Sequence, residues 1–103
     1  MNSLKAEGEK KMNLFRRKNN LWIRDRLVYT ERMVMITNVI ADEIKAERYK
    51  AALSGDDSRL RHLRRDLDTV AEMVRFIGRM NSKEEFMNEC LDDLRYFENE
   101  YIN

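Results

Sequence analysis

The chain has 103 residues, enough for one small domain, and it combines 43% hydrophobic residues with an unusually high 38% of charged ones. Its longest apolar run, residues 33–36, is far shorter than the roughly 20 residues that span a bilayer, and its N-terminus lacks the apolar segment of a signal peptide. The net charge is only +1, and the single cysteine, Cys90, excludes an internal disulfide. We therefore expect a cytoplasmic protein with no transmembrane segment.

The N-terminal dozen residues are polar, include Gly8, and are predicted to form a mobile tail, residues 1–12. Ordered structure is expected to begin near Asn13 or Asn20, because either side chain could cap a helix. Residues 13–103 are then expected to form a single helical domain.

A long first helix is predicted to reach Leu53, because apolar residues recur along it at helical spacing in two stripes. One stripe contains Trp22, Tyr29, Met33, Ile36, Ile40 and Ile44. The other contains Leu21, Val28, Met35 and Val39. Two stripes on one helix indicate that it contacts neighbours on two sides.

Two shorter helices are predicted after the first. Gly55 suits the left-handed end of a helix, and the apolar residues that follow it are spaced by three and four as in a heptad seam. That seam contains Leu60, Leu63, Leu67, Val70, Val74 and Ile77. Ser82 and Glu85 have capping-box spacing at the start of the last helix, whose apolar residues are Phe86, Cys90, Leu94, Phe97 and Tyr101.

The predicted fold is all-α: a long first helix plus two shorter antiparallel helices in a three-helix bundle. The short helices cannot cover both sides of the long one, so its N-terminal half is expected to keep an apolar surface for a protein partner or a second copy. A helical homodimer is the simplest arrangement. The residues expected on this surface are Leu21, Trp22, Val28, Tyr29 and Met35.

Charge is distributed unevenly along the chain. Residues 1–65 contain 16 Lys and Arg against 9 Asp and Glu, whereas residues 66–103 contain 4 against 10. In the second helix, Arg61 lies four residues from Asp57, His62 from Asp66 and Arg64 from Asp68, all off the seam, whereas Arg59 and Arg65 have no acid at this spacing. Such pairing is typical of a solvated helix face. The alternative is a nucleic-acid surface, where cations beside aromatic rings suit a single strand. Its candidate contacts are Arg16, Arg17, Lys18, Arg24, Arg26, Arg59 and Arg65.

No catalytic or metal-binding motif occurs in the sequence. His62 is the only histidine and has no second ligand at metal-binding spacing. Glu43 and Glu47 share a helix face but lack the Glu-x-x-His motif of dinuclear iron bundles. Acidic neighbours disfavour a reactive thiolate at Cys90. We therefore expect no enzyme activity, no metal and no cofactor.

The helix order resembles that of the helical chorismate mutases, in which arginines and a lysine hold a dicarboxylate. Arg32 in "TERM" resembles the arginine of their first helix, and Arg16 or Arg17 could stand for an earlier one. The pattern departs where their lysine should stand, since Asp42 and Glu43 occupy that place, and Cys90 and Leu94 fill the inward positions of the last helix. An enzyme of this kind is the third hypothesis. The first hypothesis is a protein-interaction module, that is, an adaptor, regulator, inhibitor or phage-like accessory protein. The second is a nucleic-acid-binding protein.

Overall fold

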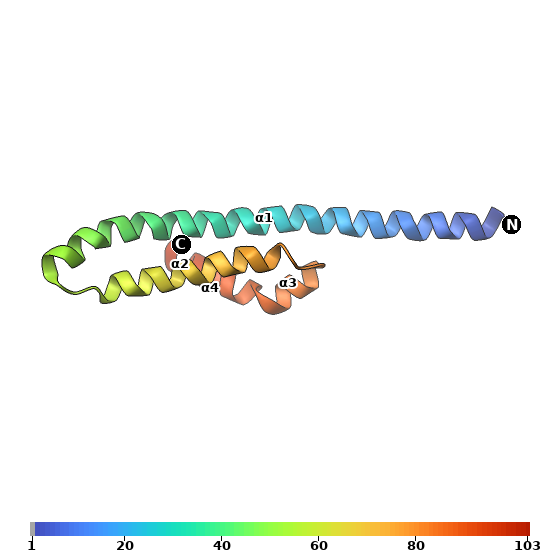
Figure 1. Cartoon of the computed structure of the whole chain (residues 1–103). Helices are drawn as coiled ribbons and strands as arrows, with labels where there is room; N and C mark the ends of the chain where they lie inside the picture. The colour runs from blue at the N-terminus through green and yellow to red at the C-terminus, as the bar shows by residue number, and fades with distance from the viewer. Residues whose placement is uncertain (1) are drawn as a thin grey trace.

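Four helices make up the fold in the computed structural model, which describes the backbone of residues 2–103 and the side chains of residues 21–103. They are α1 (Asn2–Ser54), α2 (Ser58–Ile77), α3 (Lys83–Glu89) and α4 (Leu91–Tyr101). Residues 2–103 contain no strand, so the predicted all-α class is confirmed. α1 packs mainly against α2, and α3 and α4 fold back beneath them (Figure 1).

α1 determines the length of the molecule. Its 53 residues span about 80 Å at 1.5 Å per residue, and the longest dimension of the chain is 79 Å. The other helices lie along one side of its C-terminal part, and its N-terminal part extends beyond them (Figure 1). The helix begins at Asn2 rather than at Asn13 or Asn20. The predicted mobile tail, residues 1–12, belongs to the segment whose side chains are not described, so its mobility stays a prediction.

The turn between α1 and α2 is built from short polar residues. Gly55 has a φ of +77°, the left-handed conformation that glycine adopts without strain, and its amide donates to the Ala51 carbonyl at 2.9 Å. The Asp56 carboxylate accepts from both the amide and the hydroxyl of Ser58, at 3.0 and 2.7 Å. These bonds lower the pKa of Asp56, and together they reverse the chain as the sequence predicted.

The core forms where α2 returns along α1. Met33, Ile36 and Ile40 of α1 are completely buried. The predicted seam of α2 is buried at Leu60, Leu63, Val70 and Ile77, but Leu67 and Val74 are only partly buried. Asp66 and Met73 are buried beside the seam, because α2 faces α4 as well as α1. The seam is therefore rotated toward α4, where Tyr101 donates a hydrogen bond to Asp66.

The expected third helix is divided into α3 and α4 at Cys90. Ser82 caps α3 by accepting from the Glu85 amide at 3.2 Å, and the Glu85 carboxylate accepts from the Asn81 amide at 3.0 Å. Cys90 has a φ of −129°, outside the helical range, and both it and Leu91 are buried. Consecutive residues of a straight helix point about 100° apart, so the kink lets both side chains enter the core.

A pair of leucine substitutions tests the rotated seam. Leu63→Ala should lower the free energy of unfolding by about 2–5 kcal/mol, because the site is completely enclosed. Leu67→Ala should cost roughly half as much or less, because solvent already reaches that side chain. Urea denaturation of both variants measures the difference. Equal losses would place Leu67 in the centre of the core and contradict the rotation.

Candidate interaction surface

Trp22 is not part of an uncovered surface, so the prediction from the sequence is wrong for this residue, and Tyr29 is only partly exposed. Trp22 is 5% exposed, and its indole Nε1 donates to the Met80 carbonyl at 2.9 Å. The ring of Phe86 lies 4.3 Å from the Tyr29 ring and 6.4 Å from the Trp22 ring, centroid to centroid. The apolar pattern predicts that the two short helices leave this part of α1 uncovered. The turn after Ile77 instead carries Met80 and α3 onto the N-terminal half.

Arg32 joins α1 to α4. Its Nε and Nη2 donate to the two carboxylate oxygens of Glu98, the Nε bond being 3.0 Å long. The hydrogen bond from Arg32 lowers the pKa of Glu98, and the same bond raises the pKa of Arg32. The guanidinium also lies 5.4 Å from the Tyr29 ring centroid. The arginine that resembles a chorismate-mutase ligand is therefore engaged in holding two helices together.

A pH series tests the Arg32–Glu98 pair. Glu98→Gln should destabilise the fold by about 1 kcal/mol at pH 7, a figure that allows for the solvent exposure of Arg32. The pKa of Glu98 is lowered in the folded state. The stabilisation that the wild-type pair provides is therefore complete at pH values above the ordinary pKa of 4.5, and it is lost as pH falls through the folded-state pKa.

Thermal unfolding of wild type and variant between pH 2 and 7 checks this dependence. Asp25→Asn is the matched control, because its 3.7 Å pair with Lys83 is exposed and should contribute little. A stability difference between wild type and Glu98→Gln that stays constant over this range would contradict the pair's role.

An uncovered row of apolar side chains lies on α1, on the side away from the other helices. Leu21, Val28 and Met35 of the predicted surface are 53%, 54% and 57% exposed. Leu27 and Val34, which were not predicted on this surface, are also 60% and 42% exposed. Each directly precedes one of these residues in the sequence, and the two share the spacing of seven. We call these five residues the outer face of α1.

The outer face has a polar centre between two apolar edges. At 100° per residue, Leu21, Val28 and Met35 form one edge, and Leu27 and Val34 form the other. Between the edges lie the exposed side chains of Arg24, Glu31 and Asn38. A shallow groove of about 340 Å³ follows the second edge and is lined by Leu27, Thr30, Glu31, Val34, Met35 and Asn38.

The candidate nucleic-acid contacts do not form one patch among the described side chains. Arg59 pairs with Glu43 at 3.3 Å, a partner on α1 that local spacing in the sequence did not reveal. Glu43 lies 19 residues from Arg24 in the sequence, about 28 Å along α1. Arg24 and Arg26 are thus far from the Arg59 end of α2, where Arg65 is also exposed. The side chains of Arg16, Arg17 and Lys18 lie outside the described residues.

The arginine-rich face of α2 is partly paired, as predicted. Arg61 pairs with Asp57 at 3.2 Å and His62 lies 3.3 Å from Asp66. Among the side chains of residues 21–103, Arg64 and Asp68 do not form the expected ion pair. Every arginine in this stretch is largely exposed, which is consistent with a solvated helix face.

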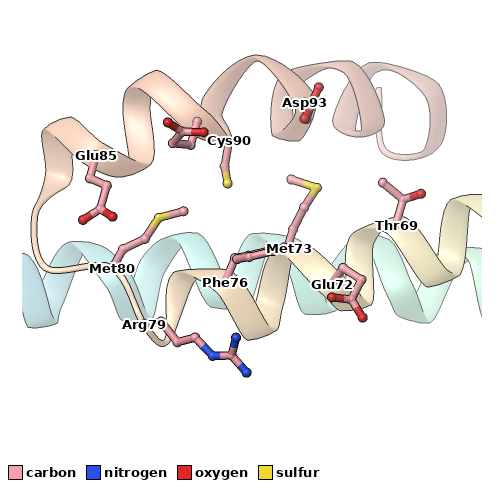
Figure 2. Close-up of a pocket in the computed structure, with 10 residues that line it drawn as sticks. Thr69, Glu72, Met73, Phe76, Arg79, Met80, Glu85, Cys90 and Asp93 are labelled. Atoms are coloured by element: carbon pink, nitrogen blue, oxygen red, sulfur yellow. The ribbon is translucent and has the colours of Figure 1, made fainter.

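A second hollow, of about 470 Å³, lies between α2 and the α3–α4 arm (Figure 2). Its lining includes Met73, Met80 and Cys90, the acidic side chains of Glu72, Glu85, Glu89 and Asp93, and Arg79. Burial raises the pKa of the Cys90 thiol, and the charges of Asp93 and Glu89 raise it further. A thiol in this setting is a poor nucleophile.

Among the described residues, no group of three or more His, Cys, Asp or Glu side chains is placed to hold a metal ion, and no helix is long and apolar enough to cross a membrane. No protein-family model, no curated protein and no solved structure matches the chain.

Proposed function

We propose that this chain is a small helical protein-interaction module, an adaptor, regulator or inhibitor that acts through the outer face of α1 and self-associates there as a homodimer. The observation that supports the proposal is the row of five aliphatic and thioether side chains left exposed on a helix whose opposite side is buried. Contiguous exposed apolar surface on a small protein is typical of an association site.

The free energy available at the outer face suits a reversible dimer. Complete burial of an aliphatic side chain is worth about 1.5–3 kcal/mol, and these five are about half exposed. Covering them stabilises each chain by roughly 5 kcal/mol, and a twofold dimer gains this twice. Association costs roughly 4–15 kcal/mol, so the gain is of the same order as the cost and polar contacts influence the outcome.

Nucleic-acid binding is the alternative, and the geometry supports it less well. Its described cations lie at two separated places, and Arg59 is already paired with a carboxylate. A protein that uses a basic groove should lose affinity steeply with added salt. Titrating labelled single-stranded RNA and DNA at two salt concentrations tests this alternative. Tight, salt-dependent binding that Arg24→Ala with Arg26→Ala weakens would favour it over the interaction module.

Charges placed on the outer face should abolish self-association. Val28→Asp with Met35→Asp should give monomers, because a carboxylate cannot be buried in an apolar interface without a partner. Both side chains are more than half exposed in the single chain, so the stability of the single chain, measured at a concentration where wild type is also monomeric, should change by less than about 1 kcal/mol. Light scattering gives the mass, and circular dichroism confirms the fold.

Met87→Asp is the matched control, since Met87 is a comparably exposed apolar residue on α3. It should leave the mass of the wild-type assembly unchanged. An unchanged mass in the outer-face variant, or an equal loss of mass in the control, would overturn the assignment of the interface to α1.

A further inference from the structure

The outer face of α1 repeats with a period of seven residues, and its charges alternate along its centre. Leu21, Val28 and Met35 are seven apart along one edge, and Leu27 and Val34 are seven apart along the other. Arg24 and Glu31 are seven apart at the centre, and neither has an ion-pair partner among residues 21–103. A heptad period of this kind is what lets two helices lie side by side over several turns.

We propose that two copies of the chain pair their α1 helices antiparallel, about a twofold axis that passes beside Leu27 and Val28, and that Arg24 of each copy binds Glu31 of the other. This inference rests on the proposed function, because it specifies how the outer face is covered. In this register Leu27 and Val28 each meet their own counterpart at the axis. Leu21 meets Met35 of the second copy at both ends.

Charge selects this register among those that keep the apolar edges together. Sliding one helix by seven residues in one direction sets Arg24 opposite Arg24, and sliding it in the other direction sets Glu31 opposite Glu31. A parallel, in-register pair sets Arg24 opposite Arg24 and Glu31 opposite Glu31. Like charges placed opposite each other in a desolvated seam disfavour the wrong pairings, so only the proposed register brings both central charges to opposite partners.

The rest of the fold leaves room for this pairing. α2, α3 and α4 all lie on one side of α1 (Figure 1), and α1 buries Met33, Ile36 and Ile40 toward them. In the twofold pair, the two bundles stand on the outside and the two α1 helices meet in the middle. The same patch is used on both copies, so the assembly closes as a dimer and does not grow into a filament.

Charge reversal tests the register. Arg24→Glu alone and Glu31→Arg alone should each weaken the dimer by about tenfold or more, because each places two pairs of like charges across the interface. The double variant Arg24→Glu with Glu31→Arg should restore dimerisation, and so should an equimolar mixture of the two single variants. Sedimentation equilibrium at low salt gives the dissociation constants. Arg64→Glu, on the exposed face of α2, is the matched control and should change nothing.

Each outcome supports or overturns a specific step. A wild-type chain that stays monomeric at high micromolar concentration overturns both the register and the proposed self-association. A wild-type dimer that neither single reversal weakens overturns the register, because a parallel pair would behave in this way. The proposed interaction module would still hold. Single variants that dissociate without rescue by the double variant also overturn the register. An unchanged circular dichroism spectrum of each variant, and unchanged thermal unfolding at concentrations where wild type is also monomeric, show that the loss comes from association and not from misfolding.

Discussion

The structure depends on one constraint: α1 carries apolar side chains on two sides, and the rest of the chain covers only one of them. The buried side contributes Trp22, Met33, Ile36, Ile40 and Ile44 to the core. α2 packs against the C-terminal part of this side, and α3 with α4 complete it. Because α2, α3 and α4 all lie on one side of α1 (Figure 1), the outer face stays exposed to solvent unless another molecule covers it.

Trp22 decides which surface is left over. Its hydrogen bond to the Met80 carbonyl and the rings of Tyr29 and Phe86 hold α3 against the N-terminal part of the bundle. Farther along, the bidentate Arg32–Glu98 pair ties α4 to α1, and Tyr101 ties it to Asp66 of α2. These contacts remove the aromatic residues from the candidate surface. The exposed outer face of α1 therefore has apolar edges and a charged centre. Such a surface suits a partner helix better than a flat partner surface.

The sequence predicted the helical class, the turn at Gly55, the cap at Ser82 and the stripe of α1 that forms the core, because each has a local signal of spacing or turn chemistry. It failed where the outcome depends on the path of the chain. Spacing alone does not say that the turn at residues 78–82 carries Met80 to Trp22, or that consecutive burial of Cys90 and Leu91 kinks the last helix. The pairing of Arg59 with Glu43 was not predicted for the same reason, because these residues lie on different helices and come together only when α2 folds back along α1. The outer face was predicted in part, through Leu21, Val28 and Met35, and the equal spacing of Leu27 and Val34 was the signal that could have completed it.

The mass of the unmodified chain in solution tests the central claim most directly. Sedimentation equilibrium over a concentration series up to high micromolar should show the mass rise from that of one chain, 12.5 kDa, toward twice that value and no further. That result would agree with an outer face covered by a second copy. A mass that stays at one chain throughout the series would contradict it, and a mass that grows past the dimer without limit would contradict the closed twofold pairing.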